Sequence, residues 1–173
     1  FQKDMISIDN FVLQGEEMLI ILDDIDQEGI LLSMKGFDFS VINPLVDYDK
    51  MYFDGTVYMD IRANDILSDR RIDVSMEVPD FTINRDTFGL LSLRAWEKNN
   101  ERIDLALNVN LDTQIMEVRG YYDLAKNYID TDIDLIKYPM TILEYIIDDG
   151  ISETRGTADL KATGELLGIE LLN

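Results

Sequence analysis

The stretch FDGTVYMDIRA, residues 53–63, alternates apolar and polar side chains along its length. Val57, Met59 and Ile61 fall on one parity, and polar residues such as Asp60 fall on the other. A period of two is the repeat of a β-strand that buries one face and leaves the other in solvent. The stretch therefore predicts a half-buried strand.

The same alternation returns repeatedly along the rest of the chain. Short polar connectors such as 97–101 and 125–127 separate the stretches, which is typical of hairpins between antiparallel neighbours. The sequence thus predicts an antiparallel meander. Its further strands are expected at 72–78, 91–95, 103–109, 116–124, 129–135 and, in RGTADLKATGELLG, 155–168.

The first fifty residues are less regular. Residues 6–9, 18–22 and 30–41 are each expected to form strands. The run at 18–22 is continuously apolar, so its inward face cannot be assigned from the pattern.

Two segments interrupt the β pattern, and they resemble each other. Residues 42–46 and 139–147 each contain an early proline and predict a short helix. Each is followed by a strand with a Gly-Thr pair, at Gly55 and at Gly156. This order predicts a diverged repeat, with units at about 30–125 and 126–173, the second incomplete; chance similarity of two short helices is the alternative. Residues 1–173 are accordingly expected to be one fragment of a larger, repeat-built β protein.

Composition narrows the classes of function. The chain has 35 acidic and 15 basic residues, a formal net charge of −20, and 46% hydrophobic residues. Such a charge repels nucleic acid, so nucleic acid is excluded as a partner. The apolar content predicts a folded domain, and the longest apolar run, 18–22, is far too short to span a bilayer.

No enzyme or metal site is expected. The chain contains no Cys and no His, and no nucleophile or phosphate-loop motif stands out. The segment DIDQEG, residues 24–29, matches the first half of a calcium loop, but Lys35 occupies the position of the closing Glu. We therefore predict a solvated turn there, no catalytic residue, no metal and no cofactor.

The apolar faces raise the question of what covers them. Their inward residues are nearly all aliphatic or Met, with Phe53 and Tyr122 as the main aromatic exceptions, and only two short helices are available as cover. A sheet that curls over its own apolar face leaves a groove, and small residues such as Ala158 and Ala162 permit tight bending. A closed sandwich of two sheets is the alternative, because the alternation does not report closure.

Three phrases carry a family resemblance: MYFDGTVYMDIRAND (51–65), GYYDLAKNYIDTDIDLIKYPMTILEYII (120–147) and ISETRGTADLKATGELLG (151–168). They resemble the C-terminal region of the translocation and assembly module (TamB) family, in the AsmA-like group of bridge-like lipid-transfer proteins of diderm bacteria. The resemblance covers most of the chain and is weakest in the first thirty residues. The order of Pro-led helix and Gly-x-Ala-x-Leu-x-Ala-x-Gly strand is its most distinctive feature.

The resemblance implies an elongated, curled antiparallel sheet (a β-taco) with two short helices, in the periplasmic part of an inner-membrane-anchored envelope protein. Its groove would shield phospholipid acyl chains on their way to the outer membrane. The expected partners are those acyl chains, the rest of the parent chain, and an outer-membrane barrel protein of the assembly machinery, with a role in outer-membrane protein assembly and secretion. The residues expected to line the lipid groove are Val57, Met59, Ile61, Ile72, Val74, Met76, Leu105, Leu107, Val109, Met116, Val118, Ile133, Leu135, Ala158, Leu160 and Ala162.

The chain departs from the family pattern at its ends. Family members continue beyond the Gly-x-Leu element with a Pro and further strands, whereas this chain ends LGIELLN, and no N-terminal anchor is seen. A closed sandwich that serves as a spacer, or as a scaffold binding unfolded barrel proteins by strand addition, is the alternative function.

Overall fold

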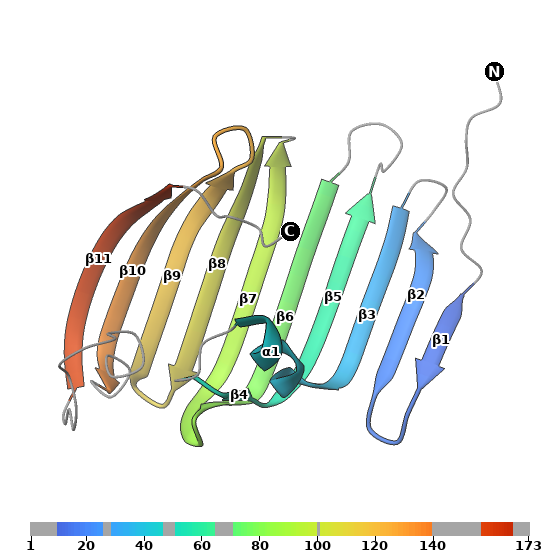
Figure 1. Ribbon diagram of the computed structural model, residues 1–173, viewed down its shortest axis with the longest axis horizontal. Helices are drawn as coiled ribbons and strands as arrows, with labels where there is room; N and C mark the ends of the chain where they lie inside the picture. Colours follow the sequence, from blue (N-terminus) through green and yellow to red (C-terminus); the bar gives the residue numbers. More distant parts are fainter. Residues whose placement is uncertain are drawn as a thin grey trace.

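The computed structural model describes residues 10–25, 29–46, 51–64, 71–99, 101–139 and 157–167. They form a single curled antiparallel sheet with one short helical segment, so the mainly β fold is confirmed (Figure 1). The helical segment is η1 (Phe39–Ile42) and α1 (Asn43–Val46). The strands are β1 (Phe11–Gln14), β2 (Leu19–Ile25), β3 (Gly29–Asp38), β4 (Phe53–Asp54), β5 (Thr56–Asn64), β6 (Arg71–Ile83), β7 (Asp86–Asn99), β8 (Arg102–Leu111), β9 (Gln114–Asp123), β10 (Tyr128–Pro139) and β11 (Thr157–Leu167).

The predicted meander is confirmed. Strands that follow one another in sequence are neighbours in the sheet, in the order β1-β2-β3-β5-β6-β7-β8-β9-β10-β11. Only β4 lies off this path, where Phe53 pairs with Ile83 at the end of β6. The two-residue turn at Asn84 and Arg85 has φ angles of 52° and 77°, as a tight hairpin connection requires.

The strand register places the apolar residues of neighbouring strands side by side. Residues paired directly across an antiparallel ladder project to the same face of a sheet. One row of such pairs crosses most of the sheet and is apolar throughout. It runs through Leu13, Ile20, Met34, Met59, Met76, Leu93, Leu107, Val118 and Ile133.

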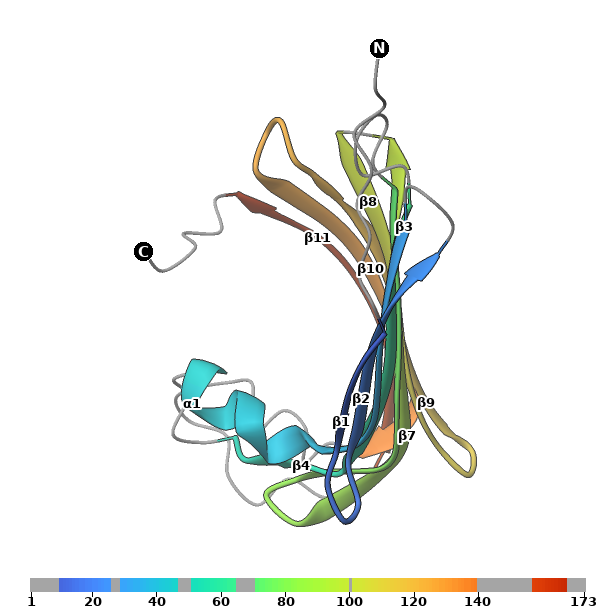
Figure 2. The same ribbon diagram turned by 90° about the vertical axis from the view of Figure 1, so that its right-hand side faces the viewer.

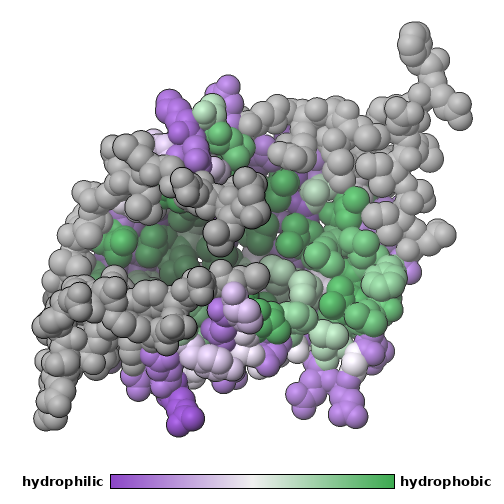
Figure 3. Space-filling model, in the orientation of Figure 1, coloured by the Kyte–Doolittle hydropathy of each residue, from purple (hydrophilic) through white to green (hydrophobic). Residues whose placement is uncertain are grey.

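The sheet bends so that this apolar face is concave. In the side view of Figure 2, the helical segment and β4 lie on the concave side, in front of the lower strand ends. Phe39 of η1 belongs there to one hydrophobic core cluster with Val57 and Val78, which lie on the same apolar face. Figure 3 looks into this side and shows hydrophobic side chains gathered in its hollow, with hydrophilic side chains along the margins.

A cluster of aromatic rings closes the lower end of the concave face. Phe39 lies 5.8 Å from Phe81 and 6.2 Å from Phe53 between ring centroids, Phe81 lies 6.1 Å from Phe88, and Phe88 lies 6.0 Å from Tyr138. We call these five residues the aromatic wall. Four of them are almost fully buried, which makes the wall part of the hydrophobic core together with Val78 and Val109. The expectation that Phe53 and Tyr122 would be the main inward aromatic residues was therefore wrong.

The stretch 53–63 is not one unbroken strand, as its alternation predicts. Gly55 has a φ of +140°, and a Cβ atom there would lie 2.4 Å from Cγ1 of Val78. The chain bends at this glycine, which separates β4 from β5 and brings Phe53 into the aromatic wall. Only glycine combines this backbone angle with so close an approach.

Other expected strand and helix boundaries differ from the structure or lie outside the described residues. The strand expected over 30–41 ends at Asp38, whose carboxylate accepts a hydrogen bond from the Ser40 amide at 2.8 Å and caps η1. Pro139, expected to begin a helix, is the last residue of β10 and pairs with Thr157. The strand expected at 6–9 and the rest of the helix expected at 139–147 lie outside the described residues. The repeat units at about 30–125 and 126–173 stay a prediction.

Candidate apolar groove on the concave face

The predicted lining residues of β5, β6, β8, β9 and β10 share the concave face. The register joins Met59 to Met76, Leu107 to Val118 and Val118 to Ile133 across neighbouring strands. Most of the set is half-buried, which leaves part of each side chain accessible from the hollow. These half-buried residues are Met59, Ile61, Ile72, Val74, Met76, Leu105, Leu107, Met116, Val118, Ile133 and Leu135.

Two predicted lining residues belong to the core instead. Val57 is 4% exposed and Val109 is fully buried, because both pack beneath the aromatic wall. A ligand on the concave face cannot reach either side chain. They support the groove and do not line it.

Ala158, Leu160 and Ala162 are known only by their backbone pairing. They stand opposite Tyr138, Leu135 and Ile133 of β10, so β11 extends the same sheet. Their side chains lie outside the described residues.

The alternation missed several residues of the concave face. Ile20 and Leu22 of β2 pair with Met34 and Leu32 of β3, and so join the apolar face. The sequence of β2 and β3 does not alternate between apolar and polar residues, because these strands carry apolar residues on both faces. The additional concave residues are Phe11, Leu13, Ile20, Leu22, Ile30, Leu32 and Met34. Leu93 and Ala95 of β7 also lie on this face, as the alternation at 91–95 predicts.

Three methionines occupy neighbouring positions on the concave face. Met34, Met59 and Met76 are paired in direct register across β3, β5 and β6. Methionine has an unbranched, polarisable side chain that adjusts to irregular apolar surfaces. This part of the groove can therefore accommodate apolar chains of different shape.

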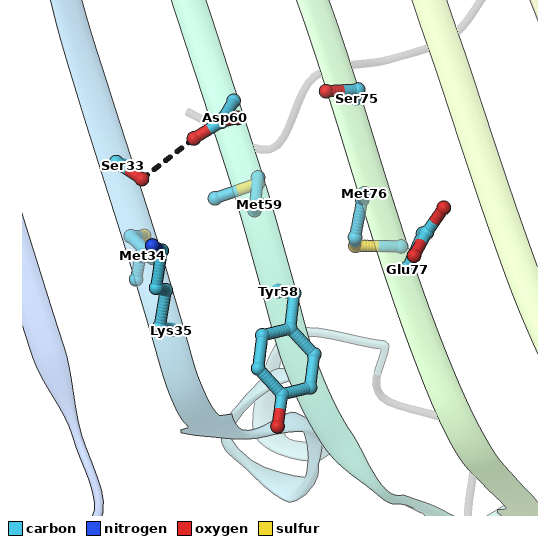
Figure 4. Close-up of a pocket in the computed structure, with 9 residues that line it drawn as sticks. All are labelled: Ser33, Met34, Lys35, Tyr58, Met59, Asp60, Ser75, Met76 and Glu77. Atoms are coloured by element: carbon cyan, nitrogen blue, oxygen red, sulfur yellow. Dashed lines mark hydrogen bonds between the residues drawn. The ribbon is translucent and has the colours of Figure 1, made fainter.

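The convex face has a different chemistry. A shallow hollow between β3, β5 and β6 is lined on this face by polar side chains, among them Lys35, Tyr58 and Glu77 (Figure 4). At its side the Ser33 hydroxyl, on a residue only 8% exposed, donates a hydrogen bond of 2.6 Å to Asp60. The bond satisfies a buried hydroxyl group, which is the ordinary requirement for a polar group removed from water.

Ion pairs and ring contacts cover the convex face farther along the sheet. Arg102 pairs with Asp104 at 2.5 Å and lies 3.9 Å from the centroid of the Tyr121 ring. Arg94 pairs with Asp73 at 3.0 Å and lies 5.4 Å from the Trp96 ring. Over β5 to β9 the convex face is therefore mainly polar and the concave face mainly apolar, with Glu97 as an acidic residue on the concave parity of β7.

Metal-binding and membrane-spanning features were searched for in the described part of the chain. There, no group of three or more Asp, Glu, His or Cys residues is placed to hold a metal ion. The half calcium motif at 24–29 begins at the end of β2 and ends at the start of β3, so strands flank it where a calcium loop of that type has helices. None of the described helices has the length and hydrophobicity needed to cross a bilayer.

The concave face can solvate apolar chains. Its described residues offer aliphatic carbon and thioether groups in continuous rows, and they offer few polar groups to fix a ligand in one orientation. Such a surface binds by removing CH₂ groups from water, at about 0.8 kcal/mol for each group. Comparisons with family models, with curated proteins and with solved structures found no match to this chain.

Proposed function

We propose that this chain is a segment of an envelope-spanning protein that shields phospholipid acyl chains during transport between the inner and the outer membrane. The concave face serves as the trough, and the periplasmic part of an inner-membrane-anchored parent protein is its place in the cell. An outer-membrane barrel protein of the assembly machinery is its partner, in support of outer-membrane protein assembly. The work is solvation and involves no chemical reaction or cofactor.

The observation that carries the proposal is the uninterrupted apolar row from Leu13 to Ile133. All described strands belong to one sheet, so no second described sheet covers this row, as it would in a closed sandwich. A soluble protein rarely leaves a continuous apolar surface of this length without a ligand or partner. A row that crosses successive strands suits a long, flexible hydrocarbon chain better than a compact ligand.

Site-specific photocrosslinking in the parent protein tests the proposal. Leu107 lies on the concave face, and its neighbour Asn108 lies on the convex face of the same strand. A photoreactive residue at 107 is expected to yield phospholipid adducts, whereas the same residue at 108 yields none. Equal labelling at both positions, or labelling at 108 alone, would contradict the groove.

A charge introduced at the same place gives an independent test. Leu107→Asp should abolish lipid transport, because a carboxylate in the row is costly to desolvate beside hydrocarbon. Asn108→Asp adds the same charge on the convex face and should leave transport unchanged. Circular dichroism must show both variants folded; normal transport by folded Leu107→Asp would overturn the proposal.

The edge of the sheet favours a second candidate function. All four residues of β1 are exposed, with Phe11 at 54% and Val12 at 51%, and β1 pairs only with β2 among the described strands. An exposed apolar edge strand can receive a further strand from an unfolded barrel protein. Val12→Lys should block the capture of an unfolded peptide and leave the lipid adducts at position 107 intact. This result would assign the two activities to different surfaces.

A further inference from the structure

We infer that Met34, Met59 and Met76 are an oxidation site within the groove, where a peroxide converts the thioethers to sulfoxides and thereby closes the groove to acyl chains. We call these three residues the methionine row. The modification would regulate the proposed function, on which the inference rests.

The methionine row belongs to a longer row that is otherwise branched aliphatic. The pairs Met34–Met59 and Met59–Met76 are in direct register across β3, β5 and β6, and the three side chains are labelled in Figure 4. Every other member of the longer row is Leu, Ile or Val, so packing there does not require sulfur. Three of the eight methionines of the chain thus occupy consecutive positions that a branched aliphatic residue could fill.

The thioethers of the methionine row are accessible to a small oxidant. The chain contains no Cys, so methionine supplies all of its sulfur. The three side chains are half-buried on the concave face, and a molecule as small as hydrogen peroxide can reach them. A sulfur lone pair attacks one peroxide oxygen, the O–O bond breaks, and the other oxygen leaves as water after a proton transfer. Sulfur loses two electrons, the peroxide gains two, and the product is methionine sulfoxide.

A sulfoxide at these positions would lie among apolar side chains. The row of Leu32, Ile61 and Val74 runs beside the methionine row on the same three strands. Val57 and Val78, both buried, flank it on the other side. None of these side chains can donate a hydrogen bond to the new oxygen. The oxygen must therefore keep water beside it, and this water excludes hydrocarbon from the row.

The methionine row lies directly on the path that we assign to the acyl chain. Leu93 pairs with Met76, and Leu107 pairs with Leu93. Neighbouring strands are about 4.8 Å apart, so a hydrocarbon chain that contacts Leu107 along the row also reaches Met76. Crosslinking at position 107 is therefore sensitive to the state of these sulfur atoms.

The test treats the full parent protein with hydrogen peroxide and measures phospholipid crosslinking at position 107. The yield after treatment is divided by the yield before it, so that each protein is its own reference, and mass spectrometry records the sulfoxides. The wild-type ratio should fall to about 0.1 or lower. The combined variant Met34→Leu, Met59→Leu, Met76→Leu should keep a ratio of about 1, because leucine has a similar volume and no sulfur.

Enzymatic reduction of the oxidised wild-type protein tests whether the effect is reversible. Methionine sulfoxide reductases A and B, with dithiothreitol as the electron donor, convert the sulfoxides back to thioethers and release water while the dithiol becomes a disulfide. The crosslink should return as the sulfoxides of the methionine row disappear. Complete reduction without return of the crosslink would overturn the inference.

A matched control removes thioethers elsewhere. Met18 and Met51 precede β2 and β4 and lie outside the methionine row, so Met18→Leu with Met51→Leu should respond to peroxide as the wild-type protein does. An equal loss of the crosslink in the triple leucine variant overturns the oxidation site but not the groove. Absence of the crosslink at 107 before any treatment overturns both.

A variant made without oxidant decides the question if circular dichroism shows that the oxidised protein unfolds. Met59 and Met76 pack against the buried core, whereas Met34 is not among the described residues that do, so Met34→Gln should leave the fold intact. Its amide oxygen imitates the polar oxygen of a sulfoxide. Crosslinking at Ile20, which pairs with Met34, should be at least about threefold weaker in Met34→Gln than in Met34→Leu. Equal yields in these two variants would contradict the inference.

Discussion

Tyr138 carries a polar group for which the wall offers no partner. Its side chain is 3% exposed, and among the described residues its hydroxyl has no hydrogen-bond partner; burial raises its pKa. A buried, unsatisfied hydroxyl costs about 1–3 kcal/mol. Tyr138→Phe should therefore raise the free energy of unfolding by about 1 kcal/mol, measured by urea denaturation.

Tyr122 provides the control of opposite sign. Its hydroxyl donates a hydrogen bond of 2.6 Å to Asn127, so Tyr122→Phe removes a bond that is made. This variant should lower the free energy of unfolding by about 1 kcal/mol. Loss of stability in Tyr138→Phe as well would mean that its hydroxyl binds a partner, such as an ordered water molecule.

Gly89 is a second position where the local structure depends on a single atom, here the absence of a Cβ. Its φ is +83°, and a Cβ atom would lie 2.3 Å from the carbonyl oxygen of Asn110. Gly89→Ala should cost at least about 2 kcal/mol, from backbone strain and a forced displacement of β8. Gly15→Ala is the control, because its Cβ would meet only Met18, at 3.8 Å. Equal unfolding midpoints for the two variants would contradict this account.

At the scale of elements, the aromatic wall holds the lower ends of distant strands together. Phe88 of β7 touches Phe81 of β6 and Tyr138 of β10 through ring contacts near 6 Å. Phe88→Ala should lower the free energy of unfolding by about 3–5 kcal/mol, because it leaves a cavity in the core. Hydrogen exchange should show the greatest loss of protection in the lower halves of β6, β7 and β10. A change confined to β7 would mean that the wall does not couple these strands.

The elements also show what the sequence could predict. Alternation assigned the faces of β5, β6, β8, β9 and β10 correctly, because polar residues fill one parity and apolar residues the other. It failed on β2 and β3, where Leu19, Ile21 and Leu31 place apolar groups on the convex face as well.

The aromatic wall could not be predicted for a different reason. Phe81, Phe88 and Tyr138 lie beside irregular positions in their strands: the register shifts at Phe81, and Gly89 and Lys137 have positive φ angles. Each irregularity breaks the period of two just where the chain turns inward. The contacts then join residues far apart in sequence, and no local pattern reports them.

At the scale of the whole molecule, the net charge and the apolar edge strand have opposite effects on self-association. The formal charge of −20 repels other copies of the chain, while β1 presents exposed Phe11, Val12 and Leu13 at the end of the sheet. Salt screens the repulsion, with a Debye length of about 30 Å at 0.01 M and about 3 Å at 1 M, but it leaves the apolar edge unchanged. The 173-residue chain should therefore be monomeric in low salt and should self-associate in high salt, as measured by sedimentation velocity.

One pair of variants separates the edge from the charge. Val12→Lys places a cation on the edge strand, where it opposes pairing with a second copy, and should prevent association in high salt. Thr113→Lys changes the net charge by the same amount in the exposed β8–β9 turn, away from that edge, and should associate as the wild-type chain does. If both variants stayed monomeric, total charge would govern association; if neither did, the contact would lie on another surface, and the concave face would be the first to examine because its apolar rows extend to β1.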